Sequence, residues 1–452
     1  MTNQKYGKTL SAIPMLHGLP MIGNLLDLRF DRLNLLVQIS RKCGDIGAFR
    51  VGPQIFLLIN SSELIHKMLV EHAYDFERPA NLRAWVRPVL GNGLLSSEND
   101  FHKQQRKLVM PAFHYHRLST YADTIIKYTD QLQSEWTEGE TIDISRQMMR
   151  LTLGIIGKAL FDADVLEEAK ELREALTITM RHVNTDFATL VHIPYVWPTL
   201  RNIRFNSAVN RLNTTVYRII SDRRKSHQDR GDLLSMLLQT RNADDGSSMT
   251  NAQVRDEVMT LFLAGHETTA NALAWAWYLL TQNLEVYKKM CEEVDCVLGR
   301  RAPTFADLSN MPYTLQVFKE AIRLYPPAYM SGRQVIHPVE LGGYHLPVGT
   351  MILNSSYTIH RRSDYFLEPE HFDPGRFTPE AEQLLPRYAY IPFGAGPHVC
   401  IGKQFALMEG HLILAAMAQR VTFKLLDDQR IIPDPLITLR PKYGIKMLVH
   451  PR

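Results

Sequence analysis

The stretch that decides the fold is FGAGPHVCIG, residues 393–402. It places Cys400 at the end of a segment with four glycine or proline residues, directly before the apolar run KQFALMEGHLILAAMA at 403–418. A cysteine that only fills a core packs better on regular backbone, whereas glycines let a flat or bulky group approach the main chain. The stretch therefore predicts a ligand-binding loop in front of a buried helix.

The composition is that of an ordinary globular protein, with 45% hydrophobic and 22% charged residues in a chain of 452. This length is enough to bury a large core and still enclose a cavity. The net charge of +4 is too small to favour nucleic-acid binding. We expect no nucleic-acid partner.

Four scattered cysteines, Cys43, Cys291, Cys296 and Cys400, contain no CxxC pair. They argue against a disulfide framework, a thiolate zinc site or a four-cysteine iron–sulfur cluster, and they fit a reducing compartment. The N-terminus lacks a signal-peptide layout, and no apolar run reaches the roughly 18–20 residues that span a bilayer. We expect a soluble, cytoplasmic protein without a membrane anchor.

Strand patterns occupy 45–60, where a Gly-Pro break suggests a hairpin, as well as 335–355 and the tail 438–450. Helical periodicity with few breakers covers 60–72, 102–110, 118–135, 143–160, 165–182, 204–225, 285–298 and 312–325. This order predicts a mainly α fold with a small β region. Because strand patterns lie at both ends of a helical middle, we expect the two ends to form one sheet region and residues 1–452 to form a single domain.

The longest predicted helix is 250–283, TNAQVRDEVMTLFLAGHETTANALAWAWYLLTQN. Thr250 and Gln253 make a capping-box start, and about 30 helical residues give a rod of roughly 45 Å. The second half is apolar nearly all round, which predicts that it is buried.

In the middle of this helix, Ala264 and Gly265 precede His266, Glu267 and Thr268. A glycine there costs about 1 kcal/mol relative to alanine, and two small residues would let a ligand lie against the backbone. The alternative is a helix kink in which the Thr268 hydroxyl bonds a carbonyl one turn earlier. A zinc-protease motif is excluded because Ala270 stands where the second histidine of H-E-x-x-H would be.

Two pairs share helix faces: Glu320 with Arg323, and His102 with Arg106. Each pair alone is more typical of a solvated surface. The order of all the motifs is far more specific than any one of them. Along the chain come Ala-Gly-x-Glu-Thr-Thr, Glu-x-x-Arg, Phe-Asp-Pro-Gly-Arg-Phe at 372–377, and Phe-x-x-Gly-x-His-x-Cys-x-Gly at 393–402.

In this order the motifs closely resemble the cytochrome P450 family of haem-thiolate monooxygenases. The resemblance runs from LPMIGN at 19–24 to TLRPKYG at 438–444. It implies haem b as cofactor, with Cys400 as the proximal iron ligand and the loop backbone from Phe393 onward close to the porphyrin. The helix after Cys400 would favour the thiolate, which promotes O–O cleavage at the iron.

The resemblance assigns further residues to the haem. Ala264 and Gly265 would lie against it, and its propionates would contact His102, Arg106, Arg333 and His398. His102 stands where many members have tryptophan and His398 where many have arginine, although both can donate a hydrogen bond. Glu320, Arg323 and Arg376 match the family's structural triad, with a role in folding and haem retention.

The activity implied is insertion of one oxygen atom from O2 into a lipophilic small molecule, by hydroxylation or epoxidation. Glu267 and Thr268 would deliver protons. Alternatives are a peroxide-driven peroxygenase, which tends to lose this acid–threonine pair, a non-catalytic haem sensor, and a haem-free helical protein. The pocket of the family would include Trp85, Leu94, Phe262, Ala328, Met330 and Leu436.

The last family strand is close to the end of the sequence, so we expect no fused flavin or nicotinamide domain. Electrons would come from a separate ferredoxin or flavodoxin with its NAD(P)H reductase. Lys103, Lys107 and Lys403 would form a basic docking patch for this partner, or else a merely solvated lysine face. We expect a monomer.

Overall fold

The computed structural model describes residues 8–163, 169–187, 194–226, 228–239 and 248–452. The α-helices are α1 (Leu25–Phe30), α2 (Arg32–Cys43), α3 (Ser62–His66), α4 (Ala80–Leu90), α5 (Asn99–Val109), α6 (Tyr115–Ser134), α7 (Ile144–Phe161), α8 (Ala169–Phe187), α9 (Leu200–Ser226), α10 (Leu233–Gln239), α11 (Asn251–Gln282), α12 (Leu284–Leu298), α13 (Pro312–Leu324), α14 (Ser356–Ile359), α15 (Pro379–Leu384) and α16 (Lys403–Arg420).

The strands are short, with two to six residues each. They are β1 (Met15–Leu16), β2 (Ile46–Val51), β3 (Gln54–Ile59), β4 (Phe76–Glu77), β5 (Thr141–Asp143), β6 (Ser331–Val335), β7 (Val339–Leu341), β8 (Tyr344–Leu346), β9 (Met351–Asn354), β10 (Val421–Leu425), β11 (Pro433–Pro435), β12 (Leu439–Pro441) and β13 (Lys446–Pro451). The mainly α fold with a small β region is confirmed.

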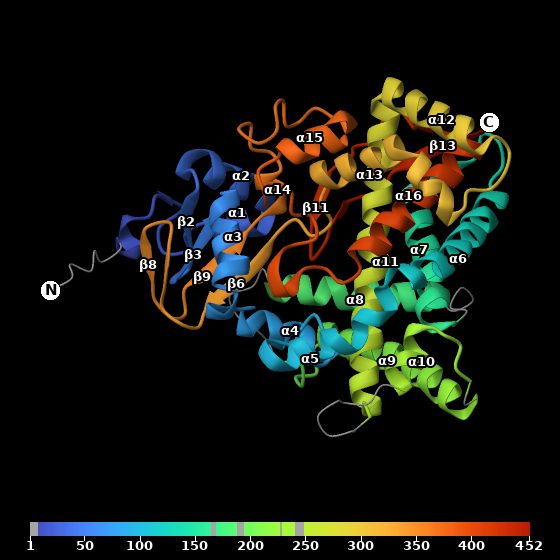
Figure 1. Cartoon of the computed structure of the whole chain (residues 1–452). Coiled ribbons are helices and arrows are strands. Elements are labelled where there is room, and N and C mark those ends of the chain that lie inside the picture. Colours follow the sequence, from blue (N-terminus) through green and yellow to red (C-terminus); the bar gives the residue numbers. More distant parts are fainter. Residues whose placement is uncertain (1–7, 164–168, 188–193, 227, 240–247) are drawn as a thin grey trace.

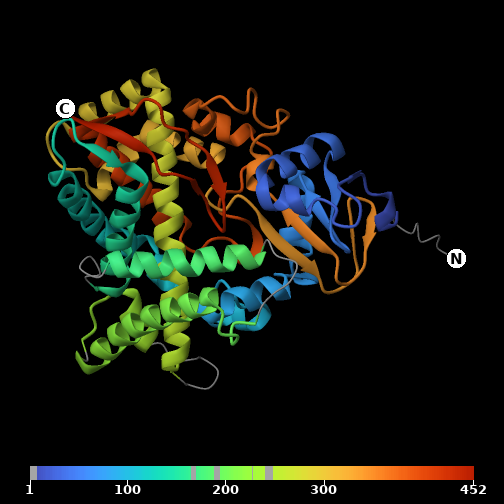
Figure 2. The ribbon, with the colours of Figure 1, turned by 180° about the vertical axis from the view of Figure 1, so that it is seen from behind.

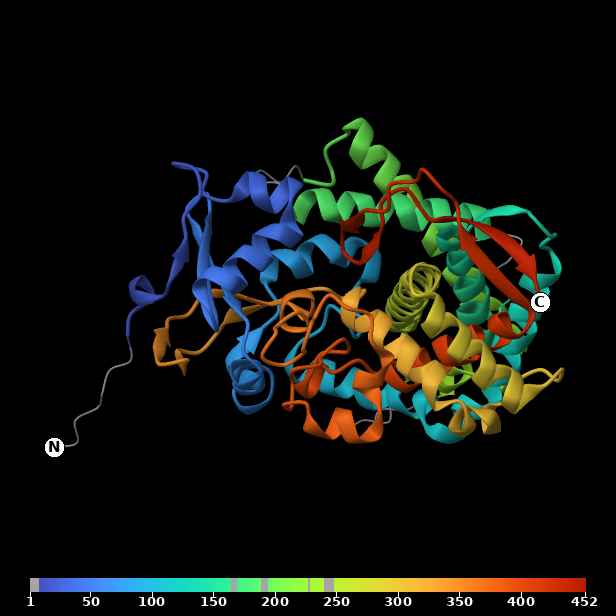
Figure 3. The same cartoon turned by 90° about the horizontal axis from the view of Figure 1, so that it is seen from above.

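Helix α11 runs through the helical part of the molecule, and other helices surround it when it is viewed end-on (Figures 1 and 3). Its first turn is closed by the predicted capping box between Thr250 and Gln253. From Thr269 to Trp277 every side chain is buried. The prediction of a long, buried central helix is therefore confirmed.

A six-stranded sheet in the order β1-β2-β3-β9-β6-β4 lies at the end of the molecule where the N-terminus is found (Figures 1 and 2). The predicted hairpin is β2–β3, with Ala48 opposite Leu57. Side chains alternate between the two faces. Leu57 packs with Ile352 on one face, and Leu58 packs with Leu36 of α2 on the other.

The prediction that both ends of the chain share one sheet is wrong for the C-terminal tail. The tail strand β13 pairs with β10 and with β5, so that Met447 lies opposite Ile142. Strands β11 and β12 form a separate hairpin. Strand β5 has only three residues and lies between helices, so its pattern is too short to be recognised in sequence.

Among the residues that the structure describes, no helix combines the length and the apolar character needed to cross a membrane.

A fully buried guanidinium connects α13 to the segment that leads to the cysteine loop. Arg323 donates to both carboxylate oxygens of Glu320, at 2.6 and 2.8 Å. It also donates to the carbonyls of His360, Pro369 and His371, at 2.7, 2.7 and 3.2 Å. An arginine has five N–H donors, and each of them has an acceptor here.

The third member of the predicted triad lies beside this pair. Arg376 Nε is 3.4 Å from a Glu320 carboxylate oxygen, and the same oxygen accepts the Asp373 amide at 2.9 Å. The three triad residues are thus brought together, with Glu320 between two arginines.

His360 extends the connection. Its Nε2 accepts the Ile391 amide at 2.9 Å, so Nδ1 carries the proton and donates to the Arg323 carbonyl at 3.2 Å. Burial holds the pKa of His360 well below its ordinary value, so the ring stays neutral. The Ile391 carbonyl then accepts the Gly394 amide. Arg323 is in this way linked by hydrogen bonds to the start of the cysteine loop.

Replacing Arg323 with Lys should destabilise the chain by about 3 kcal/mol or more, because lysine cannot satisfy all five acceptors and Glu320 would remain as a buried charge. The measurement is the free energy of unfolding in denaturant. Arg150→Lys is the matched control, since its pair with Glu135 is exposed and should change stability by less than about 1 kcal/mol. Equal losses in the two variants would contradict the role of Arg323.

Candidate functional site

The cysteine loop, residues 393–402, is closed by two backbone hydrogen bonds, from Cys400 to Phe393 at 2.9 Å and from Val399 to Gly396 at 3.0 Å. Gly394 and Gly396 have φ values of +70° and +69°, a conformation that favours glycine. A Cβ on Gly396 would lie 1.7 Å from the Leu69 carbonyl oxygen. Gly394 would meet no atom within 4 Å, so its backbone remains open to a ligand.

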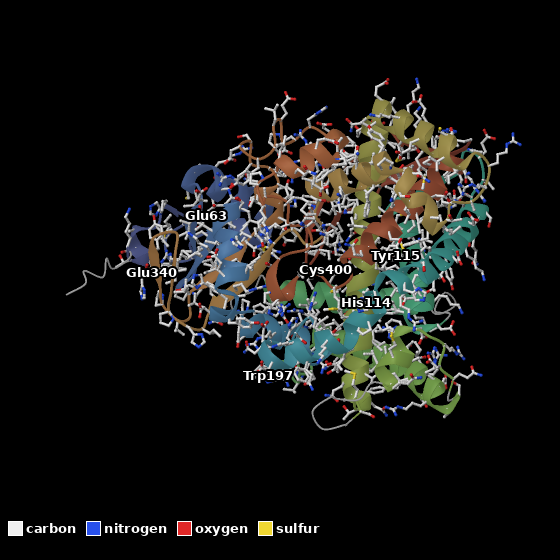
Figure 4. The ribbon with its side chains drawn as sticks, viewed as in Figure 1. Glu63, His114, Tyr115, Trp197, Glu340 and Cys400 are labelled. Atoms are coloured by element: carbon white, nitrogen blue, oxygen red, sulfur yellow. The ribbon has the colours of Figure 1, made fainter. Side chains whose placement is uncertain are left out.

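Cys400 lies in the middle of the molecule (Figure 4), although its side chain is accessible. Burial inside the molecule raises the pKa of Cys400 above its ordinary value, whereas the Gly402 amide, Arg106 and Lys403 act in the opposite direction. The loop and the helix after it thus favour the thiolate, in the direction that the sequence predicts, against the effect of burial. A metal ion that binds the sulfur would displace the thiol proton.

Accessible side chains occur at three further positions inside buried stretches. Ala264 is exposed on α11, Ala328 is exposed in a turn whose neighbours are buried, and Ile437 is 39% exposed beside buried Thr438. The Leu439 amide bonds the Pro327 carbonyl, which places two of these segments side by side. These positions lie in segments where the family resemblance predicts the substrate pocket, so we propose that α11, these two turns and Cys400 border one internal space.

The predicted pocket residues differ in their accessibility. Ala328 is exposed, Trp85, Met330 and Leu436 are half-buried, and Leu94 and Phe262 are buried.

A cluster of cations lies beside the loop, and we call it the cation cluster: Arg78, His102, Arg106, Arg333 and His398. The His102 and His398 rings contact each other, with centroids 4.0 Å apart. Arg106 donates to the Val399 carbonyl at 2.7 Å. Three of the four predicted propionate-binding residues thus contact the loop or each other, and the fourth, Arg333, is near enough to His398 to lower its pKa.

One carboxylate, Glu98, lies within this cluster. It is 2.9 Å from Arg78 and 3.1 Å from the Nε2 of His398. These partners hold the pKa of Glu98 at about 2, although burial acts in the opposite direction. His398 is therefore already paired through Nε2, and its buried Nδ1 has no hydrogen-bond partner among the residues that the structure describes.

The three arginines of the cation cluster carry more positive charge than Glu98 can neutralise. Burial, with His398 and Arg78 nearby, lowers the pKa of His102 to about 3. Burial and Arg78 likewise lower the pKa of Arg333 to about 10. Two further carboxylates beside these side chains would offset the excess positive charge and raise the pKa values of His102 and Arg333 again. The donor set therefore fits a planar ligand with two acid groups, as haem has.

Sequence reasoning missed Arg78 and Glu98. Strand β4 pairs with β6, with Glu77 opposite Gln334, and this pairing brings Arg78 close to Arg333. The only local sequence feature is a charged pair before Pro79. Nothing close to this segment in sequence indicates that it would form a strand and pair with another strand more than 250 residues away.

Helix α11 contributes the small residues and hydroxyls. A Cβ on Gly265 would lie 2.6 Å from the Ile156 side chain of α7, so this glycine has a packing reason. The Thr268 hydroxyl donates to the Ala264 carbonyl at 2.7 Å. This is the bond to a carbonyl one turn earlier that the alternative of a helix kink predicts. The single hydrogen of the hydroxyl is used there, but its oxygen can still accept, and Thr268 is only half-buried.

The Glu267 carboxylate is buried and accepts a hydrogen bond of 2.6 Å from Thr438. Asn271, one turn later on α11, donates to the same hydroxyl at 3.1 Å. Sequence reasoning did not find Thr438, because it is more than 160 residues away from Glu267.

The loop between α4 and α5 is fastened to α11 by two successive carboxylates. Asp256 accepts the Asn92 amide at 2.8 Å, and Glu257 accepts the Leu94 amide at 3.2 Å. Burial raises the pKa of Glu257 to about 7. Within the described part of the chain, the other oxygen of Glu257 and the Thr260 hydroxyl are buried without hydrogen-bond partners.

Comparison with known proteins is consistent with this geometry. The family model for cytochrome P450 matches residues 13–449. Cyclooctatin synthase of Streptomyces melanosporofaciens is 37% identical over 438 residues, which cover 96% of this chain and 95% of that protein. Cyclooctat-9-en-7-ol 5-monooxygenase of the same organism is 35% identical, covering 89% and 87%. Pentalenene oxygenase of Streptomyces avermitilis is 30% identical, covering 96% and 94%.

The pKa of Glu257 predicts a dependence of stability on pH. Because the folded pKa is raised from 4.5 to about 7, the folded state binds a proton more tightly than the unfolded state does. The resulting stability is fully present below pH 4.5 and is lost as the pH rises through about 7.

Glu257→Gln should therefore be more stable than the parent chain at pH 8 and close to it at pH 4.5. The measurement is the melting temperature at both pH values. Glu63→Gln is the control, because Glu63 is exposed and paired with Lys67, so it should give no stabilisation at pH 8. A pH-independent effect of Glu257→Gln would contradict the raised pKa.

Proposed function

The chain belongs to the cytochrome P450 family, and from this premise we propose how its residues support the monooxygenase reaction of that family. The enzyme is a cytochrome P450 monooxygenase with a haem-iron cofactor, O2, a lipophilic substrate and a redox partner. The balance is R–H + O2 + two electrons + two protons giving R–OH + H2O. One observation carries the proposal: the Cys400 side chain is accessible, and it lies beside the cation cluster, whose positive charge exceeds the charge of Glu98.

The finer cofactor assignment is haem b, held by residues of the cysteine loop and the cation cluster. Cys400 would ligate the iron, and Phe393 and the small residues Ala264 and Gly265 would contact the ring. Arg333, Arg106 and His102 would face the acid groups, and His398 would join them with both ring nitrogens protonated, because its Nε2 hydrogen is directed at Glu98. When bound, the haem supplies the site at which O2 is activated.

The protein's own part in the chemistry is proton supply. Thr268 borders the internal space and has an oxygen free to accept a hydrogen bond, which suits it to orient water there. Glu267 is the adjacent carboxylate that would resupply protons. The acid–threonine pair favours a monooxygenase over a peroxygenase or a sensor, since neither alternative needs it.

We propose a cyclic, largely hydrocarbon substrate of terpenoid type. The names of three relatives refer to cyclooctatin, cyclooctat-9-en-7-ol and pentalenene. The accessible side chains of Ala264, Ala328 and Ile437 are apolar, which suits such a molecule.

For electron supply we propose a separate ferredoxin or flavodoxin with its NAD(P)H reductase. On α5, Lys103 and Lys107 are exposed, while His102 is buried and Arg106 is half-buried. Lys403 is exposed next to the cysteine loop. This arrangement supports a basic docking patch on the cysteine side. The single domain 1–452, the monomeric state and the cytoplasmic location stay predictions.

Cys400→His should abolish the red-shifted Soret band of the reduced, carbon-monoxide-bound protein, together with product formation, because the band marks thiolate ligation. The spectrum is recorded alongside Cys296→Ser, an exposed cysteine elsewhere whose loss should leave both unchanged. If Cys400→His kept the band, another residue would be the ligand.

Thr268→Val should lower the product formed per NAD(P)H consumed, with hydrogen peroxide in its place, and slow product formation roughly 10²-fold. Haem content and substrate affinity should survive. Glu267→Gln should slow turnover but lower the ratio of product to NAD(P)H less than Thr268→Val does, because the Thr268 hydroxyl remains.

The control for Thr268 is Thr281→Val on the same helix. Thr281 makes the same type of bond, to the Tyr278 carbonyl at 2.7 Å, and lies outside the site. An unchanged ratio of product to NAD(P)H in Thr268→Val would leave Thr268 as a packing residue.

A further inference from the structure

The carboxylate assigned to proton supply is held by a residue from a distant part of the chain. Thr438 is in the turn between β11 and β12, and its hydroxyl donates to Glu267 Oε1 at 2.6 Å. Thr438 is 6% exposed and Glu267 8%, so water competes little for this bond.

The direction of this bond is fixed by a third residue. Asn271 Nδ2 donates to the Thr438 hydroxyl oxygen at 3.1 Å, and an amide nitrogen can only donate. The single hydroxyl hydrogen is therefore left for Glu267. Asn271 and Glu267 are four residues apart on α11, so both meet Thr438 on one helix face.

The turn itself is held firmly by the rest of the fold. Arg32 of α2 donates to the Pro435 carbonyl at 2.8 Å, and the Tyr329 hydroxyl donates to the Leu436 carbonyl at 2.9 Å. On the other side, the Trp275 indole donates to the Leu439 carbonyl at 3.1 Å. Thr438 therefore has a fixed position from which to orient a side chain on α11.

We propose that Thr438 is a positioning residue for proton supply: it fixes Glu267 Oε1 and leaves Oε2 as the oxygen that exchanges protons. The inference deepens the proposed function and rests on it. Its neighbours Leu436 and Ile437 border the internal space, so the turn that faces the substrate also orients the carboxylate. Thr438 does not touch the reacting atoms; it acts through Glu267.

Thr438→Val keeps the shape of the side chain and removes the hydroxyl. Turnover should fall about ten-fold, a part of the roughly 10²–10⁴-fold contribution of a positioned acid or base. The solvent isotope effect on turnover should rise, while substrate affinity, read from the ferric haem spectrum, stays the same. Thr438→Ser should restore turnover, because the hydroxyl returns.

Two comparisons separate positioning from general damage. Thr438→Val combined with Glu267→Gln should be no slower than Glu267→Gln alone, because both changes act on one carboxylate. Thr129→Val, which removes a buried hydroxyl from α6, should change neither turnover nor the isotope effect. Additive losses in the double variant would overturn the proposal.

A readout independent of turnover is the infrared spectrum. The carboxylate stretching band that disappears in Glu267→Gln belongs to Glu267, and it should shift in Thr438→Val but not in Thr129→Val. An unshifted band would also overturn the proposal. If the parent enzyme yields no oxygenated product at all, the proposed function fails, whereas a coupled parent with an unaffected Thr438→Val refutes only the role of Thr438.

Discussion

The fully buried pair of Arg323 and Glu320 is the interaction on which the rest of the site depends. Removing a guanidinium and a carboxylate from water costs several kcal/mol per ion, and this cost is recovered only when every donor has an acceptor. The acceptors come from α13 and from the segment that carries His360 and His371. These parts must therefore assemble together. Through His360 and Ile391 the same network fixes the start of the cysteine loop.

The cation cluster follows the opposite logic. Arg323 finds all its acceptors within the protein, whereas Arg333 and His102 have pKa values lowered by burial and by neighbouring cations. Such a cluster is more stable once further anions arrive, because each one relieves repulsion in a medium of low dielectric constant. The frame around the cysteine loop is thus complete in the chain alone, while the charge balance beside it would be completed by the acid groups of the proposed haem.

Local patterns predicted much of this fold. The capping box of Thr250, the hairpin of β2 and β3 and the buried second half of α11 all rest on residues close in sequence. What could not be predicted depends on distant pairing. The strand β5 is too short to stand out, and Arg78 enters the site only because β4 pairs with β6. The pKa of Cys400 also depends on packing from several elements, which no helix-end argument includes.

The hydrogen bonds that α11 makes with Thr438 can orient the Glu267 carboxylate but cannot pass a proton to it. In the chain from Asn271 through Thr438 to Glu267, every hydrogen already points towards the carboxylate. A proton could travel along it only if Thr438 gave up its hydrogen and took another from a neutral amide, which is a very weak acid. Thr438 can therefore orient Glu267 but cannot resupply it, and protons must reach the other carboxylate oxygen by a different route. With Ile437 at the proposed substrate space and Glu267 in its proposed role, a change in this turn that alters the fit of the substrate would also disturb proton supply, and would so couple substrate choice to efficient use of O2.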